Sequence, residues 1–228
     1  EIDSILNLYQ NKLFNDVISK AQLCLKNYPT SVSLLNILGL AHTHLENTED
    51  AISYFEKAIS LDANFPEAYN NLGMLYSNSS KYQNAIEAFT VAIEKNPLFF
   101  DAMCNLAATY YRMQDSDNAV LIFKKVIELK PNHKHANHSL GNIFFEKRDL
   151  KSSLAQYLKI VKCDPKYFQA YNNIGTIYHD YVNFDLAKLN FLKAIDINPT
   201  FFSAHYNLGN LYSDMGDKSA ALASYERA

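Results

Sequence analysis

A spacing of 34 residues, or twice that distance, separates five of the six glycines in the sequence: Gly39, Gly73, Gly141, Gly175 and Gly209. The same step connects a series of aromatic residues and a series of prolines. The aromatic series is Phe55, Phe89, Phe123, Tyr157, Phe191 and Tyr225, and the proline series is Pro29, Pro97, Pro131, Pro165 and Pro199. A fixed period between about 20 and 50 residues is typical of a solenoid or an array of repeats. We therefore expect similar units stacked in a row, each contacting only its neighbours.

Each unit is expected to contain two helices. In the unit 66–99, small and apolar residues recur at the three- and four-residue spacing of a helix face. They do so on both sides of the polar stretch 77–84. They are Tyr69, Leu72, Gly73, Tyr76, Ala85, Phe89 and Ala92. Pro97 cannot continue a helix and marks the turn into the next unit. The pattern predicts helices over about 66–79 and 83–96, and it predicts that the two cross at Gly73, where a side chain would have no room.

This arrangement resembles the tetratricopeptide repeat, a 34-residue helix–turn–helix with Leu-Gly, Tyr, Ala, Phe and Pro at set positions. The resemblance covers the whole chain. It divides the sequence into a partial repeat at 1–31, full repeats at 32–65, 66–99, 100–133, 134–167 and 168–201, and a truncated repeat at 202–228. It implies an all-α fold, with one α-solenoid domain over 1–228. The stacked units would form a right-handed superhelix whose first helices line the concave side.

Asparagines gather on the first helices, opposite the predicted buried stripe. If each repeat is numbered so that Gly73 is position 8, the amides fall at positions 5, 6 and 9. The candidate binding residues are Asn36, Asn70, Asn71, Asn105, Asn142, Asn172, Asn173, Asn207 and Asn210. Because an amide both donates and accepts hydrogen bonds, such a ladder can pair with an extended peptide backbone. Tyr111 and Arg112 are expected to border the same groove. The alternative is that asparagine, which is abundant here, is simply tolerated on an exposed face.

The position-6 residues Asn71, Asn105, Asn173 and Asn207 are similar to the groove asparagines of the O-linked N-acetylglucosamine transferase family, and Ile37 and Ser139 depart from that pattern. In that family these amides hold the backbone of an extended polypeptide. The resemblance favours a protein–protein interaction scaffold that binds an extended segment in its groove. The alternative is a substrate-recruiting arm of a larger enzyme, such as a glycosyltransferase, whose catalytic domain lies outside this sequence.

Several other functions are not expected. The formal net charge of −3 and the pI of about 6.2 disfavour nucleic acid and anionic lipid as partners. No apolar run reaches the length of roughly 18 residues that spans a bilayer. The sequence contains no phosphate loop, metalloprotease motif or nucleophile elbow, so we expect neither catalysis nor a cofactor within it. The three cysteines, Cys24, Cys104 and Cys163, imply no disulfide framework, which fits a reducing compartment, and we expect a cytoplasmic location.

Three histidines, His133, His135 and His138, lie close together in the sequence. The three-residue spacing of the last two permits a metal site or a pH switch. No carboxylate or cysteine nearby in the sequence completes a ligand set, so we expect solvated surface histidines and no metal.

The two ends of the sequence bear on its partners. It begins with Glu1 rather than methionine, and it ends at Ala228 within an expected helix. Terminal repeats normally need a polar capping helix, so we expect the natural protein to continue. We also expect end-to-end self-association through the uncapped last repeat.

Overall fold

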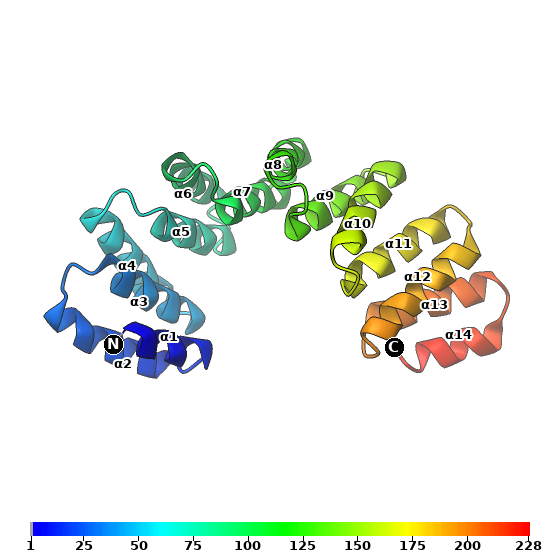
Figure 1. The fold of residues 1–228 in the computed structure, drawn as a ribbon, viewed down its shortest axis with the longest axis horizontal. Coiled ribbons are helices and arrows are strands. Elements are labelled where there is room, and N and C mark those ends of the chain that lie inside the picture. Colours follow the sequence, from blue (N-terminus) through cyan, green and yellow to red (C-terminus); the bar gives the residue numbers. More distant parts are fainter. Residues whose placement is uncertain (1) are drawn as a thin grey trace. The chain divides into compact units, whose positions relative to one another are not determined.

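The computed structural model describes residues 2–228, which form fourteen α-helices and no strand (Figure 1). Each 34-residue repeat contributes one helix pair, whose members we call the A helix and the B helix. The A helices are α1 (Ile2–Gln10), α3 (Val32–His44), α5 (Pro66–Asn78), α7 (Phe100–Arg112), α9 (Lys134–Glu146), α11 (Phe168–Asp180) and α13 (Phe202–Asp214). The B helices are α2 (Phe14–Asn27), α4 (Thr48–Leu61), α6 (Tyr82–Lys95), α8 (Ser116–Leu129), α10 (Leu150–Cys163), α12 (Phe184–Ile197) and α14 (Lys218–Tyr225).

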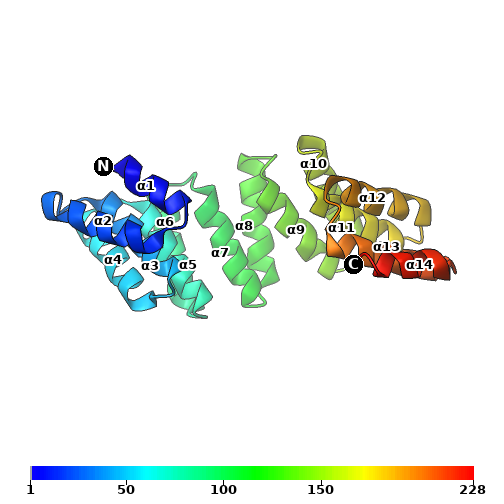
Figure 2. The same ribbon diagram turned by 90° about the horizontal axis from the view of Figure 1, so that it is seen from below.

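The predicted all-α solenoid of stacked helix pairs is confirmed, and the helix ends differ from the expectation by one residue. Two compact units make up the chain, Glu1–Ile122 and Phe123–Ala228, with the boundary inside α8. In each unit the most extensive contacts join the A and B helices of one repeat, as in α5 with α6 and α11 with α12 (Figure 2). Neighbouring A helices also touch, namely α3 with α5, α5 with α7, and α11 with α13. A single domain and a right-handed superhelix stay predictions.

The glycine at position 8 is required by the aromatic ring of its own repeat. A Cβ atom added to Gly73 would lie 2.7 Å from Cε1 of Phe89, and one added to Gly175 would lie 2.7 Å from the ring of Phe191. Such distances are far shorter than ordinary carbon–carbon contacts of about 3.5–4.0 Å. Both rings are almost completely buried. The predicted lack of room at the helix crossing is confirmed, and the B-helix ring is what fills the space.

The turn between the A and B helices contains one residue in the left-handed region at the same position of every repeat. These residues are Lys12, Glu46, Ser80, Gln114, Arg148, Val182 and Gly216, with φ between 58° and 80°. A left-handed residue ends the regular helix, which explains why α5 stops at Asn78 and α6 begins at Tyr82, one residue earlier than expected. Only the last of these turns has glycine, the residue that adopts this conformation without strain.

Candidate functional site

In the first unit, the predicted groove asparagines of successive A helices bond to one another. Asn71 Nδ2 donates to Asn36 Oδ1 at 2.9 Å, and Asn105 Nδ2 donates to Asn70 Oδ1 at 3.0 Å. Each bond joins position 6 of one A helix to position 5 of the preceding A helix, and we call such a pair a rung. The rungs follow from the contacts of α3 with α5 and of α5 with α7.

The second unit contains a matching rung and a modified one. Asn207 Nδ2 donates to Asn172 Oδ1 at 3.0 Å, which repeats the geometry of the first unit. Asn173 Nδ2 instead lies 3.4 Å from Nε2 of His138, the residue at position 5, and 3.5 Å from Oδ1 of Asn142. The histidine therefore takes the place of an amide in this rung.

The amides of two rungs differ in accessibility. Asn70 and Asn172, at position 5, are each only 7% exposed, although the sequence pattern predicts an exposed groove position. The next A helix places its position-6 amide over each of them, whereas Asn36 stays half-buried beside Asn71. The position-6 residues remain half-buried. Within residues 2–228, Oδ1 of Asn71 and of Asn105 accepts no hydrogen bond, whereas Oδ1 of Asn173 accepts from Asn172 Nδ2 at 3.3 Å. Position 6 in the first unit therefore presents an acceptor that is free and held in a fixed direction.

Asn142 and Asn210, also predicted as groove residues, contact the B helix of their own repeat. Tyr157 donates its hydroxyl proton to Oδ1 of Asn142, and Tyr225 donates to Oδ1 of Asn210 at 2.8 Å. Burial raises the pKa of Tyr157 to about 12, so its hydroxyl stays a donor at neutral pH. These two amides therefore tie the A helix to the B helix. The sequence contains a signal for this, because an asparagine stands at position 9 only in the two repeats that have tyrosine in the aromatic series.

Arg112 belongs to a polar cluster that the sequence pattern does not predict. Its Nη1 donates to Ser77 Oγ at 3.1 Å and to Asn78 Oδ1 at 3.2 Å, both on the preceding A helix. The hydroxyls of Ser77 and Thr109 lie 3.0 Å apart and are buried. Together with Met74, Phe89, Asn105 and Ala108, these residues line a small pocket of about 100 Å³. Tyr111, the other predicted border residue, is half-buried on the same helix.

The position of Arg112 is occupied by acidic residues in the second unit. Arg148 Nη1 lies 2.9 Å from Asp180 Oδ2, and His179 Nε2 lies 2.8 Å from Asp214 Oδ2. In both pairs the cationic or imidazole group comes from the preceding repeat. These carboxylates therefore link consecutive repeats along the edge of the A helices.

His138 does not fit the expectation of a solvated surface histidine. It is half-buried, with its ring 5.8 Å from the ring centroids of Tyr157 and Tyr167. Burial, together with the neighbouring His135, lowers its pKa below 6.5. His133 caps α9, because its Nδ1 accepts from the backbone N–H of Ala136 at 3.2 Å. The expectation overlooked that the packing of successive repeats covers position 5.

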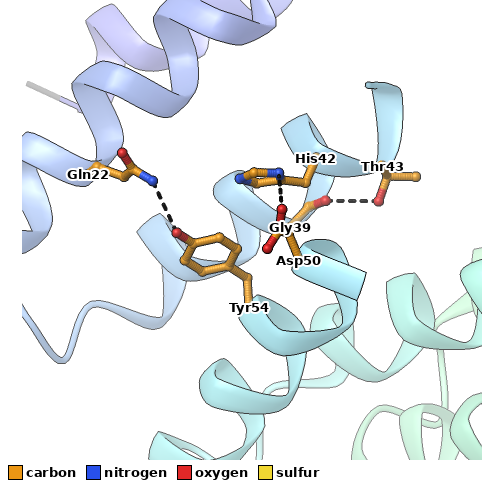
Figure 3. Close-up of polar contacts among 6 residues, drawn as sticks. All are labelled: Gln22, Gly39, His42, Thr43, Asp50 and Tyr54. Atoms are coloured by element: carbon orange, nitrogen blue, oxygen red, sulfur yellow. Dashed lines mark hydrogen bonds and ion pairs between the residues drawn. The ribbon is translucent and has the colours of Figure 1, made fainter. Parts of the chain in front are cut away.

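A buried histidine, His42, lies in the first unit (Figure 3). His42 is 8% exposed, stacks on Tyr54 at 5.3 Å between ring centroids, and places Nδ1 3.6 Å from Asp50 Oδ2. Gln22 donates to the hydroxyl of Tyr54 at 3.2 Å. The later repeats carry tyrosine or phenylalanine at the position of His42. The imidazole therefore serves as a packing ring in this repeat.

Residues 2–228 contain neither a candidate metal site nor a candidate membrane span. No group of three or more His, Cys, Asp or Glu side chains has a geometry that could hold a metal ion. None of the helices in this part is both long and apolar enough to cross a membrane.

Hairpins of two helices that repeat every 34 residues and stack through their A helices define a helical-repeat solenoid protein. Within that class, the chain belongs to the tetratricopeptide-repeat family. Two family models described as tetratricopeptide repeat match it, one at residues 32–65, 100–133 and 168–201, and the other at 54–87 and 190–223. Together these matches cover more than half of the chain, and those of the first model begin and end where the glycine series places the repeats.

Solved structures with the same fold share little sequence with this chain. A tetratricopeptide-repeat protein, YrrB, described as having an unusual peptide-binding site, is 22% identical with a TM-score of 0.60, over 81% of this chain and 95% of its own. The C-terminal part of a repeat protein from Cytophaga hutchinsonii is 15% identical with a TM-score of 0.75, over 100% of this chain and 93% of its own. PilF from Pseudomonas aeruginosa is 14% identical with a TM-score of 0.74, over 85% and 88%. No curated protein matches the chain.

Proposed function

We propose that the chain is a protein-interaction scaffold that binds an extended polypeptide along the A helices, with the position-6 asparagines holding the peptide backbone. One observation carries the proposal: each of these amides uses an N–H group in a rung, so its orientation is fixed before any ligand arrives. A group that is already oriented loses less conformational entropy on binding than a free side chain does. Polypeptide binding also accords with the peptide-binding site described for YrrB.

The expected affinity is modest. A hydrogen bond between an amide and a peptide group contributes about 0.5–1.5 kcal/mol net, so four position-6 amides contribute about 2–6 kcal/mol. Association costs roughly 4–15 kcal/mol in lost freedom. The ladder alone therefore gives weak binding that tolerates many sequences, and further contacts such as the pocket at Arg112 must add specificity.

The test compares two sets of substitutions that break rungs from opposite sides, and the control leaves the rung of Asn173 with His138 intact. The position-6 variant replaces Asn71, Asn105, Asn173 and Asn207 with alanine. The control replaces the position-5 partners Asn36, Asn70 and Asn172 with alanine, which removes rung bonds and leaves the position-6 amides in place. Binding of labelled unstructured peptides is followed by fluorescence anisotropy, and circular dichroism checks that both variants are folded.

The position-6 variant is expected to lose peptide binding, while the control binds more weakly than the unmodified protein but measurably. Equal binding by the position-6 variant and the unmodified protein contradicts the proposal. It would mean that the amides serve only to hold neighbouring repeats together and that any partner contacts another surface.

A further inference from the structure

A cavity of about 270 Å³ in the second unit lies away from the rungs. It opens between the B helices α8 and α10, and α9 forms its floor. Its lining residues are Lys124, Ile127, Leu140, Phe144, Ser152, Gln156 and Lys159. None of them takes part in a rung or in the edge pairs of the A helices, so the proposed peptide-binding face leaves this cavity unexplained.

The cavity combines an apolar floor with a cationic mouth. Leu140 is 2% exposed, and Ile127 and Phe144 are half-buried. Lys124 Nζ lies 5.9 Å from the centroid of the Phe144 ring, and Lys159 Nζ donates to Gln156 Oε1 at 3.3 Å. Both lysines are exposed, and within residues 2–228 neither is paired with a carboxylate. The chain as a whole carries a net charge of −3, so this mouth differs in sign from the rest of the molecule.

Acidic groups of the chain itself do not neutralise the mouth. No aspartate or glutamate lines the cavity. The acids nearest to the two lysines in the sequence are Glu128, four residues after Lys124, and Asp164, five residues after Lys159. Within residues 2–228 no ion pair joins Glu128 to Lys124, and Asp164 pairs with Lys134 at 2.7 Å. Asp149, the residue just before α10, accepts from the backbone N–H of Ser152 at 3.1 Å with its Oδ1. That carboxylate is committed to capping the helix, and hydrogen bonds from Ser152 hold its pKa below the usual range. The two ammonium groups therefore remain available to an acidic ligand.

The size of the cavity restricts what can enter. Pockets for drug-sized ligands have volumes of about 300–1,000 Å³, and this cavity lies just below that range. One apolar side chain fits it better than a whole small molecule does. We propose that the cavity is a second binding site, which accepts an apolar side chain of a partner polypeptide whose flanking aspartate or glutamate residues pair with Lys124 and Lys159.

The next repeats carry leucine at two of the equivalent positions. Thirty-four residues further on, Leu158 replaces Lys124 and Leu186 replaces Ser152. The short side chain of Ser152 therefore helps to leave the space open. Ser152→Leu copies a residue that this fold already accommodates at the same position, so it is expected to fill the cavity without unfolding the chain.

The experiment measures the binding of short peptides that carry one leucine between glutamates, with glutamine replacing both glutamates in the control peptide. We expect the glutamate peptide to bind more tightly than the glutamine peptide. Its affinity should fall as salt is added, because salt screens exposed charges. Ser152→Leu should abolish this binding, and the double variant Lys124→Glu, Lys159→Glu should weaken it by about tenfold or more. Lys151→Glu, on an exposed residue of α10 that does not line the cavity, is the matched control and should leave binding unchanged.

Equal affinity for the two peptides, or undiminished binding by Ser152→Leu, would overturn the proposal. So would binding of N-acetyl-leucine alone as tightly as the peptide, since that indicates a site for small anions. Concentration-dependent dimerisation that Ser152→Leu abolishes would identify a second copy of the chain as the occupant and would also overturn it. The position-6 alanine variant should bind the glutamate peptide normally, which separates this site from the proposed peptide-binding face.

Discussion

In the first unit, the charged residue at the edge of the A helices is Arg112, which donates to the neutral groups of Ser77 and Asn78. In the second unit the same position holds Asp180 and Asp214, each paired with Arg148 or His179 from the preceding repeat. The rungs beside these edges are built from the same two positions in both units. Positions 5 and 6, which form the rungs between repeats, are therefore kept in both units. The edge position, which holds Arg112, Asp180 or Asp214, varies in charge.

This difference indicates how one repeat pattern can present two chemical surfaces. Within residues 2–228, Arg112 has no carboxylate partner, so its charge is available to a neutral or acidic part of a ligand. In the second unit, Asp180 and Asp214 instead pair with groups of the preceding repeat. Their charges are therefore partly neutralised within the protein, and each pair connects two repeats. Pairs of this kind between exposed groups contribute little, about 0–1 kcal/mol each, so we expect the two units to differ more in ligand preference than in stability.

The largest expected effect is a loss of packing that should be equal in the two units. Phe89 and Phe191 are 1% and 0% exposed and lie against Gly73 and Gly175. Replacing either with alanine should lower the free energy of unfolding by about 3–5 kcal/mol, because each leaves a cavity. Urea denaturation measures the loss, and hydrogen exchange shows where protection falls. Leu189→Ala, at a residue that is 63% exposed, is the control and should change stability by less than about 0.5 kcal/mol.

If Phe89→Ala lowers protection as much in residues 123–228 as in residues 2–122, the division into two units has no energetic meaning. A local loss of protection would support it, since stability in a repeat protein is approximately a sum over repeats and their interfaces.

The second prediction concerns the hydrogen bond between Tyr157 and Asn142, which replaces an apolar contact of the first unit. Tyr157→Phe should lower the free energy of unfolding by about 0.5–1.5 kcal/mol, because the oxygen of Asn142 loses the nearer of its two donors. Adding Asn142→Leu copies the pair Phe55 and Leu40 of the first full repeat and should restore most of the loss. Thermal melts of the single and double variants check this, and a double variant weaker than Tyr157→Phe would contradict it.

The third prediction uses the left-handed turn residue of the second unit. Val182 has φ 58° and is 71% exposed, and a β-branched residue is strained in this region. The left-handed conformation costs roughly 1–2 kcal/mol for most residues, and asparagine tolerates it better. Val182→Asn should therefore raise the free energy of unfolding by about 0.5–1 kcal/mol. Ser80→Asn in the first unit, with φ 59°, should give a smaller gain, because serine is not β-branched. Equal gains at the two turns in urea denaturation would refute the strain at Val182.

The smallest expected effect is a pH dependence specific to the modified rung. Burial lowers the pKa of His138 below 6.5, so the unfolded chain binds a proton more readily than the folded chain does. The stabilising contribution of neutral His138 is therefore complete above about pH 6.5 and is lost as the pH falls below that value. His138→Asn copies the amide of Asn70 in the first unit and should reduce this loss. The check is the difference in urea midpoint between pH 7.5 and pH 5.5 for both proteins, and identical differences would contradict the prediction.

Much of the fold was predictable from the sequence, because the 34-residue period identifies the residues that occupy the same position in different repeats. It located the helix pairs and the crossing at Gly73, since an interior glycine in a helix is costly unless space demands it. That the ring of Phe89 fills this space is known only from the structure. The period did not predict that Asn70 is buried. The repeat period identifies residues 34 apart as equivalent, whereas a rung bond joins residues 35 apart. This one-residue difference depends on how far one A helix is displaced along its neighbour, which the period does not specify.

The candidate site was predictable in part for the same reason. The position-6 amides were found, and the pairing of Tyr157 with Asn142 was visible as two substitutions that occur together. The cluster of Ser77, Thr109 and Arg112 left no such trace, because it occurs between one pair of repeats only. A feature that occurs once in a repeated sequence gives no periodic signal, and its contacts become evident only from the packed helices.

The rung bonds also have a consequence for how the chain folds. Asn71 with Asn36 and Asn105 with Asn70 are each separated by 35 residues, so forming such a contact requires closure of a loop only about one repeat long. The entropic cost of closure grows with loop length, and chains with short sequence separations between contacting residues fold quickly. Folding can therefore begin at any two adjacent repeats and proceed in both directions, and each added repeat closes one more loop of the same length.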